Sequence, residues 1–290
     1  MNQKINIWNG FFWRKFFAET MILTCLEIIQ DYGLRSIGLG ERVLPKTDIT
    51  ICHQATLIGS GMLWNIYFGV LALILGFFFA ILLSLGRRSD HQIVSYLCDT
   101  FILIFRGTPL FIQFFFAYFL FLSLKKAFPV FDPFTSAWLG ALIILFFNTS
   151  AYSANIFYGA LVAIPRGEID ASDSFGMSNW QKFRSIEFRQ MLRLAWPAYI
   201  NEAIFMFHAT TLVFFSAFPT RQQKGDALYY ANYFADKTFN PFIPYPIVAI
   251  YFIILTIFLV LLARVLNSSL NRHLPKSVSK PLRLRFNFLR

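Results

Sequence analysis

Two apolar stretches of the chain, residues 137–164 and 196–218, contain polar side chains that could act on a polar solute. The residues concerned are Asn148, Asn155, Glu202, His208, Thr210 and Thr211. Polar groups are costly in hydrocarbon and usually face a bundle interior or a pathway. They would therefore line a route for a solute or join helices by hydrogen bonds, and the small hydroxyl side chains favour the second role. Glu202 and His208 are six residues apart, which is not a same-face spacing, and either a pathway or a structural charge pair fits them.

No arrangement of residues typical of catalysis occurs in the sequence. It contains no Gly-x-Ser-x-Gly elbow, no His-Glu-x-x-His pair and no phosphate-binding Walker loop. Its four histidines are scattered, and its three cysteines lack a metal-ligand spacing. We therefore predict no enzyme, no catalytic residue, no cofactor and no metal site, so that energy for any pumping would come from a partner or an ion gradient.

The interval 163–194 is charged and lies between two strongly apolar segments. Glu168 and Asp170 favour the first turn of a short helix, because acids there interact well with the helix dipole. Gly176 suits a left-handed position just past the end of that helix, and Ser178 with Gln181 has the spacing of a capping box. The interval therefore predicts two helices in a hairpin, placed where the membrane meets the cytosol.

Composition places the chain in a membrane. Of its 290 residues 57% are hydrophobic, 37 are Phe and only 14% are charged, whereas a soluble domain has about a quarter charged residues. The net charge of +11 fits a membrane protein, because the cytoplasmic loops of such proteins contain an excess of Lys and Arg. No nucleic-acid-binding motif accompanies this charge, so nucleic acid is not an expected partner.

Five apolar segments are long enough to cross a bilayer, which takes about 20 residues. They are residues 62–85, 101–124, 137–164, 196–218 and 243–266. The second is interrupted at Arg106-Gly107-Thr108-Pro109, and since Pro109 suits a first helical position, we expect the crossing helix to start there after a separate short helix. The predicted parts are an N-terminal extension, 1–61, a transmembrane domain, 62–266, and a basic tail, 267–290.

Basic residues outside the spans set the predicted orientation. Fifteen Lys and Arg residues lie on one side and five on the other, so the positive-inside rule makes the first side cytoplasmic. The hairpin and the tail then lie inside and residues 1–61 outside; the tail either touches anionic lipid or is a solvated end. Residues 5–30 contain four charges and favour an interfacial amphipathic helix over a span. Cys25 and Cys52 could form a disulfide if both face an oxidising compartment, although packing is the role that we favour for them.

Three blocks of sequence carry a family resemblance. They are Phe105-Arg106-Gly107-Thr108-Pro109-Leu110 with Gln113, then Ala151-Tyr152 through Gly159-Ala160-Leu161 to Ile164-Pro165-Arg166-Gly167, and finally Asp170-Ala171-Ser172, three residues, and Gly176. Together with Pro197 and Asn201-Glu202 downstream, these blocks resemble the permease subunits of bacterial ABC importers, specifically the polar amino acid (histidine/glutamine/arginine/opine) branch. The resemblance covers about residues 60–266.

The resemblance implies an all-α integral membrane protein, a five-span ABC importer permease (MetI-like) bundle with a cytoplasmic coupling helix hairpin. It implies a multi-pass protein of the bacterial inner membrane with a cytoplasmic C-terminus. This protein would form the pathway for a polar solute, and the solute expected is an amino acid. The implied partners are cytoplasmic ATP-binding subunits, a second permease subunit of the same or a homologous chain, a periplasmic solute-binding protein and membrane lipid. The residues expected to couple to the ATPase are Glu168, Asp170, Ala171, Ser172, Gly176, Met177 and Trp180.

Departures from the family pattern weaken any inference about the charge of the solute. Asn155 and Tyr158 stand where the family commonly has an acid and a base, so the resemblance does not imply a charged solute. Two alternatives to the importer are an ion-driven secondary transporter and a membrane-embedded lipid-modifying enzyme. The first favours inverted repeats with broken helices, and the second needs a convergent catalytic set near one interface; neither pattern occurs in the sequence.

Overall fold

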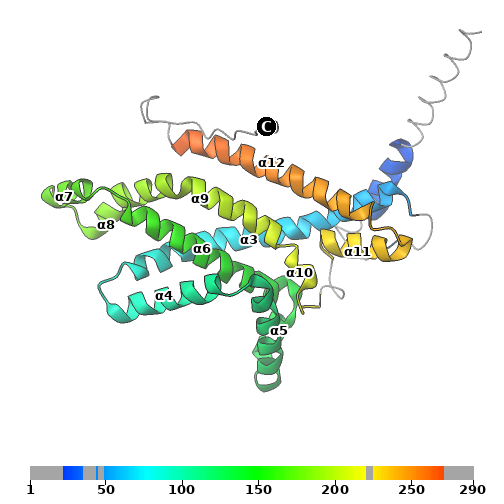
Figure 1. Cartoon of the computed structure of the whole chain (residues 1–290), viewed down its shortest axis with the longest axis horizontal. Coiled ribbons are helices and arrows are strands. Elements are labelled where there is room, and N and C mark those ends of the chain that lie inside the picture. Colours follow the sequence, from blue (N-terminus) through cyan, green and yellow to red (C-terminus); the bar gives the residue numbers. More distant parts are fainter. Residues whose placement is uncertain (1–21, 35–43, 45–48, 220–224, 271–290) are drawn as a thin grey trace, which may run out of the picture. The chain divides into compact units, whose positions relative to one another are not determined.

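The computed structural model describes residues 22–34, 44, 49–219 and 225–270. Regular structure in this part of the chain is entirely helical (Figure 1), which confirms the predicted all-α class. The α-helices are α3 (Ile51–Arg87), α4 (Gln92–Gly107), α5 (Leu110–Ala127), α6 (Leu142–Val162), α7 (Arg166–Ser174), α8 (Asn179–Lys182), α9 (Phe188–Ala209), α10 (Leu212–Phe215), α11 (Ala227–Thr238) and α12 (Pro244–Leu270). Three short π-helical segments are described, η1 (Ile29–Leu34), η3 (Ala137–Ala141) and η4 (Phe183–Glu187), together with one 3₁₀-helix, η2 (Pro129–Thr135). Residues 1–21 and 271–290, with most of the predicted interfacial segment and basic tail, lie outside the described residues.

The chain forms two compact units. One comprises Met1–Tyr67 and Pro219–Tyr251, and it contains the start of α3, all of α11 and the start of α12. The other comprises Phe68–Phe218 and Phe252–Arg290, and it contains the helices from α4 to α10 with the rest of α3 and α12.

In the first unit, α3 begins eleven residues before the predicted span. The predicted N-terminal extension ends at Gly61 and the first predicted span starts at residue 62, whereas the helix already runs from Ile51 through this segment. A Cβ atom at Gly61 would lie 2.6 Å from the backbone nitrogen of Ala227, and Asn65 Oδ1 accepts a hydrogen bond from the same nitrogen at 3.1 Å. Gly61 therefore permits close approach of two backbones and marks no turn.

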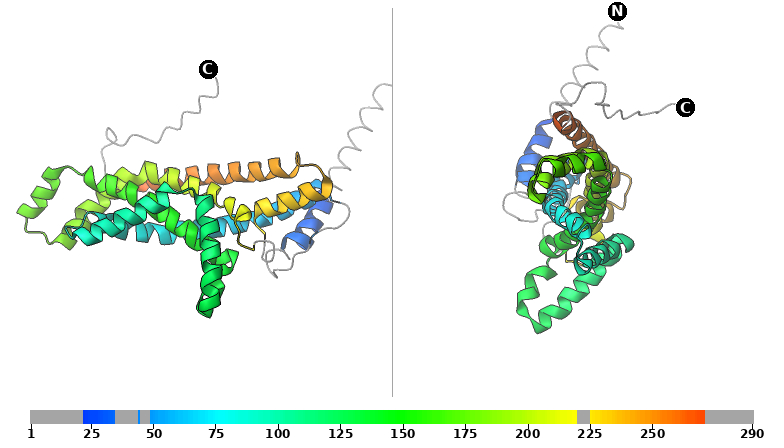
Figure 2. Two further views of the ribbon diagram at one scale, coloured as in Figure 1. Left: turned by 60° about the horizontal axis from the view of Figure 1, so that its bottom comes forward. Right: turned by 90° about the vertical axis from the view of Figure 1, so that its left-hand side faces the viewer.

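The second predicted span consists of two helices, as the motif around Pro109 indicates. α4 ends at Gly107, and α5 begins at Leu110 and runs in a steeply different direction (Figures 1 and 2). Gln113 Nε2 donates to Phe105 O at 2.8 Å and to Thr108 O at 2.9 Å. These bonds satisfy carbonyl groups that the end of α4 leaves without an intrahelical partner, which a break at membrane depth requires.

Four described helices are long and apolar enough to cross a membrane. They are Ile51–Arg87, Leu110–Ala127, Ala137–Val162 and Pro244–Asn267. These contain the first predicted span, nearly all of the third and fifth, and most of the second. The fourth predicted span, 196–218, is divided between α9 and α10. α9 falls short in hydropathy because it contains Arg189, Arg193 and Glu202, yet it packs along α6 (Figure 2).

Apolar packing holds the second unit together where α3, α4, α6 and α9 meet. Phe157 and Met191 are fully buried there, and the Phe157 ring lies 5.4 Å from the rings of Phe77 and Tyr199. Helices in a bilayer associate mainly through such van der Waals contact. The packing fixes the ends of α6 and α9 that carry α7 and α8 (Figure 1).

Candidate functional site

The charged interval forms the predicted hairpin, whose first arm is α7. The residue after its C-cap, Gly176, has a φ of 69°. Met177 N donates to Ser172 O at 3.2 Å, and Gly176 N donates to Asp173 O at 2.9 Å. This is the Schellman arrangement, which satisfies the last carbonyl groups of a helix. The predicted place of Gly176 at the end of the helix is confirmed.

A capping box starts the second arm. Ser178 Oγ accepts from the Gln181 amide at 3.3 Å, and Gln181 Oε1 accepts from the Ser178 amide at 2.9 Å. α8 then continues through η4, a wider π-helical turn, directly into α9. Such turns are frequent at functional sites. The second arm of the hairpin and the following membrane helix are therefore one rod.

Polar contacts hold the two arms together. The Glu168 carboxylate in the first turn of α7 accepts a hydrogen bond from Gln190 Nε2 on α9. Lys182 on α8 forms an ion pair with Asp173 on α7. Ser172 is buried, and its hydroxyl donates to a carbonyl of α7 at 2.6 Å. The hairpin is thus braced at both ends of α7.

The tip of the hairpin is exposed. Asp170 and Ala171 lie on the surface, and the Trp180 side chain is 66% exposed. Phe175, which no sequence motif singles out, is 82% exposed. A lone Phe among charged residues gives no periodic signal, and only the structure shows that it is exposed at the end of α7. Aromatic side chains presented in this way are typical of contact with another protein.

Arg87, at the end of α3, contacts residues of α4 and α6. Its Nε lies 2.5 Å from Asp99 Oδ1, and its Nη1 donates to Asn155 Oδ1 at 3.0 Å. Its guanidinium also lies 4.2 Å from the centroid of the Tyr158 ring. The two residues that replace the family's acid and base therefore both bind this arginine. Asn155 belongs to a contact between helix ends and does not join the other predicted pathway residues.

Arg88, the next residue, contacts a different element. Its Nη2 donates to Glu187 Oε1 at 2.8 Å, and Glu187, the last residue of η4, is only 5% exposed. The pair joins α3 to the rod formed by α8, η4 and α9. A buried carboxylate with a specific partner was not predicted, because its partner is 99 residues away in the sequence.

Asn148 and Glu202, two predicted pathway residues, lie in one buried polar cluster. Thr149 Oγ1 donates to Glu202 Oε1 at 3.2 Å, which joins α6 to α9. Asn148 Nδ2 donates to Gln113 Oε1 at 3.3 Å, which joins α6 to α5 at the break after α4. All four side chains are buried. The cluster therefore lies where three helices of the second unit meet.

Arg106 brings a positive charge to this cluster. Its guanidinium lies 5.3 Å from the centroid of the Tyr152 ring, and it is the cation whose field acts on the Glu202 carboxylate. In the sequence, Arg106 counts among the cytoplasmic charges, and Tyr152 is only part of a family block. Their place beside Glu202 depends on the break between α4 and α5, which the motif at Pro109 signalled.

The other three predicted pathway residues lie elsewhere. His208 Nε2 is 3.0 Å from Thr256 Oγ1 on α12. The hydroxyls of Thr210 and Thr211 donate to backbone carbonyls of the turn that ends α9. No ion pair joins Glu202 to His208 in the described part of the chain. His208 serves as an interhelical contact, and the two threonines help to terminate a helix.

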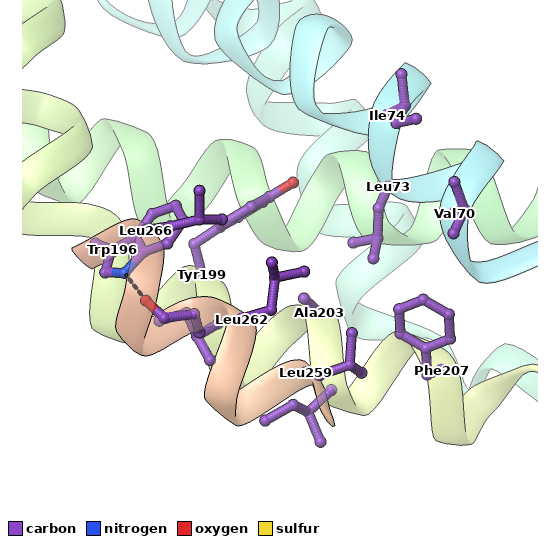
Figure 3. Close-up of a pocket in the computed structure, with 13 residues that line it drawn as sticks. Val70, Leu73, Ile74, Trp196, Tyr199, Ala203, Phe207, Leu259, Leu262 and Leu266 are labelled. Atoms are coloured by element: carbon purple, nitrogen blue, oxygen red, sulfur yellow. Dashed lines mark hydrogen bonds between the residues drawn. The ribbon is translucent and has the colours of Figure 1, made fainter. Parts of the chain in front are cut away.

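A pocket of about 350 Å³ in the second unit has almost wholly apolar walls (Figure 3). Side chains of α3, α9 and α12 line it, among them Leu73, Phe207 and Leu262. At one end the indole Nε1 of Trp196 donates to Ala263 O at 3.4 Å. None of the predicted pathway residues lines this pocket, and it offers too few polar groups to hold a polar solute.

In the first unit, Cys25 and Cys52 form a disulfide with their Cα atoms 5.7 Å apart. The ring of Tyr32 also packs edge-on against His53, with 5.0 Å between centroids. The favoured role of simple packing was wrong for this pair, because only the fold shows that their backbones approach. The disulfide ties the segment that precedes α3 to its first turn.

Comparison with known proteins agrees with this architecture. Residues 56–272 match the family described as "Binding-protein-dependent transport system inner membrane component". The histidine/lysine/arginine/ornithine transport system permease protein HisM of Salmonella typhimurium is 31% identical over 208 residues, which is 71% of this chain and 86% of HisM. The nopaline transport system permease protein NocM of Agrobacterium fabrum is 33% identical over 145 residues, 49% of this chain and 60% of NocM.

The fold has a solved counterpart. A crystal structure of an amino acid ABC transporter with histidines has a chain that aligns with a TM-score of 0.63 and 22% identity, covering 77% of this chain and 100% of that one. The family match extends over most of the described residues, including the hairpin and the polar cluster. The chain therefore belongs to the family of binding-protein-dependent transport system inner membrane components.

Proposed function

We propose that this chain is the permease subunit of an ABC importer for a polar amino acid, and that its α7–α8 hairpin receives motion from cytoplasmic ATP-binding subunits. HisM is named for histidine, lysine, arginine and ornithine, all of which are small solutes with an ammonium and a carboxylate group. The family is named for transport that depends on a binding protein. A second permease subunit and an external solute-binding protein complete the proposed assembly.

The observation that carries the proposal is the construction of the hairpin. Its tip presents Phe175 and Trp180 to solvent, while its second arm continues as a helical rod into α9. A protein that grips the tip would therefore move α9 as a rigid body, without first having to order a loop. This mechanical continuity suits coupling to a motor that belongs to other chains.

The polar cluster supplies the proposed pathway. The Glu202 carboxyl group, bonded to Thr149, and the Arg106 guanidinium, which lies over the Tyr152 ring, bring an acid and a base to one part of the bundle. Ionisable side chains at membrane depth mark substrate routes more often than they serve packing. A zwitterionic amino acid would present its ammonium group to the carboxylate and its carboxylate to the guanidinium. The acid and the base would thus substitute for the water that surrounds the solute outside.

The disulfide supports the proposed orientation. Disulfides persist in oxidising compartments such as the bacterial periplasm, so the start of α3, at Cys52, would lie outside. Because α3 is long enough to cross a bilayer, its other end at Arg87 would lie inside. The positive-inside count gives the same orientation, and with it a cytoplasmic hairpin and C-terminus.

Reconstitution tests the proposal. We expect the chain, purified from its host in mild detergent, to bring an ATP-hydrolysing subunit with it, and the reconstituted complex to take up amino acid only with ATP and a solute-binding protein. Uptake driven by an ion gradient without ATP would establish the secondary-transporter alternative instead. Absence of any ATP-binding subunit from the purified complex would contradict the proposal.

Two variants test its parts. Glu202→Gln removes the ionisable carboxyl group from the cluster, so we expect reduced uptake by an intact complex, whereas Asp236→Asn neutralises an exposed carboxylate on α11 and should change nothing. Normal uptake kinetics in the Glu202→Gln complex would leave helix packing as the role of the cluster. For orientation, a thiol introduced by Trp180→Cys should resist impermeant maleimide in intact cells and react in inverted vesicles.

A further inference from the structure

Arg87, the last residue of α3, and Arg88, the residue that follows it, hold different parts of the second unit. Arg87 binds Asp99 on α4 and Asn155 on α6, at 2.5 Å and 3.0 Å. Arg88 binds Glu187 on η4 at 2.8 Å. The first arginine thus fastens α3 to the body of the bundle. The second fastens it to the rod that emerges from the hairpin.

Glu187 lies at a mechanically distinctive position. It ends the wide turn η4, and α9 begins at the next residue. Helices kink preferentially at π-helical turns, so without a brace the rod would bend there most easily. The carboxylate is 5% exposed while Arg88 remains partly exposed, so the pair fixes the bending point of the rod against α3.

We infer that the contact between Arg88 and Glu187 is the fulcrum through which displacement of the hairpin tilts α9, with both residues acting as positioning residues for transport. The inference rests on the proposed function. Eight residues separate Asn179, where the rod begins, from Glu187, and fifteen separate Glu187 from Glu202. At 1.5 Å per residue these arms are about 12 Å and about 22 Å long.

The unequal arms amplify motion. A rod that pivots at Glu187 moves Glu202 in the opposite sense to the hairpin and roughly twice as far. Such a displacement would separate Glu202 from Thr149 on α6, to which it is bonded at 3.2 Å. Without the fulcrum, the hairpin would bend at η4 and α9 would stay packed on α6. ATP would then be hydrolysed without movement of the solute.

The experiment measures ATP hydrolysed per solute imported by the reconstituted complex. Glu187→Leu replaces a buried carboxylate by an apolar side chain, and the Arg88 left behind can reach solvent, so the complex should still assemble. We expect ATP hydrolysis within about twofold of wild type and a ratio of ATP to solute raised about tenfold. The matched control is Arg87→Ala, which removes the neighbouring arginine without touching the hairpin and should leave the ratio unchanged.

A charge-reversal experiment distinguishes loss of the ion pair from a general structural defect. Arg88→Glu alone should uncouple as Glu187→Leu does, and the double variant Arg88→Glu/Glu187→Arg should restore the ratio, because it rebuilds the ion pair in reverse. An unchanged ratio in Glu187→Leu, an equal rise in Arg87→Ala, or an assembled double variant that stays uncoupled would each overturn the inference. A wild-type complex that imports without ATP would instead overturn the proposed function, so the two failures are distinguishable.

Discussion

Asp226 allows a prediction about pH whose size can be worked out from the structure. It is the N-cap of α11, its Oδ1 accepts from the Tyr229 amide at 2.8 Å, and Asn65 donates a second hydrogen bond to its carboxylate. Burial outweighs these bonds and raises the pKa of Asp226 from its ordinary 3.8 to about 7. Between these values the folded chain holds a proton that the unfolded chain has lost, so stability falls as the pH rises through this window.

The magnitude is large enough to measure. At 1.36 kcal/mol per pKa unit, the difference between 3.8 and about 7 gives a total loss of about 4 kcal/mol. From about pH 5 to about pH 8 the expected loss is about 3 kcal/mol, or about 6 °C in the melting temperature of a chain of this size. The matched variant is Asp226→Asn, because Asn caps a helix about as well as Asp and does not titrate.

Thermal unfolding of the purified protein in detergent tests this reasoning, with wild type and Asp226→Asn compared across that pH range. Other groups titrate in both proteins, so the informative quantity is the difference between the two melting temperatures. We expect the variant to gain on wild type as the pH rises to about 7, and the difference to stay constant above that value. Equal slopes for the two proteins, or a wild type that gains on the variant, would refute the argument that burial dominates at Asp226.

Three further predictions concern glycines and the disulfide. Gly61→Ala should destabilise the protein by about 1 to 3 kcal/mol, since its Cβ would meet the backbone of α11; Gly159→Ala, with open space at its Cβ, is the control, and equal melting temperatures would exclude the close approach. Gly176→Ala strains a left-handed residue by about 1 kcal/mol and should weaken binding of the ATP-binding subunit about fivefold. Gly176→Asn should bind almost normally, because Asn tolerates this conformation. Equal affinity in both variants would mean that the turn does not position the docking surface. Cys25 and Cys52 should react with an impermeant maleimide in intact cells only after reduction, and labelling without a reductant would show that they are free thiols.

Local features were predictable because the interacting residues are neighbours in the chain. The apolar runs indicated the spans, Gly176 marked the end of α7, and Ser178 with Gln181 marked the start of α8. Each depends on composition or on contacts within one helical turn, which any conformation of the rest of the chain would preserve. The start of α3 was misplaced for the opposite reason. Gly61 resembles a loop residue locally, and only the backbone of α11 explains why it lies in a helix.

The sequence by itself determined that this is a membrane protein with a capped hairpin, since apolar length, charge bias and short-range capping are properties of the chain alone, and its three motif blocks indicated a permease by resemblance to a known family. The tertiary structure decided which residues meet. The partners of Cys25, Glu202 and Glu187 are 27, 53 and 99 residues distant, and contacts of that range depend on how helices pack, because no periodicity in the chain encodes them. For the same reason, only the tertiary structure shows that Asn155 and His208 lie apart from the polar cluster. The polar residues of two spans do not reveal, in the sequence, which faces of the two helices pack against each other.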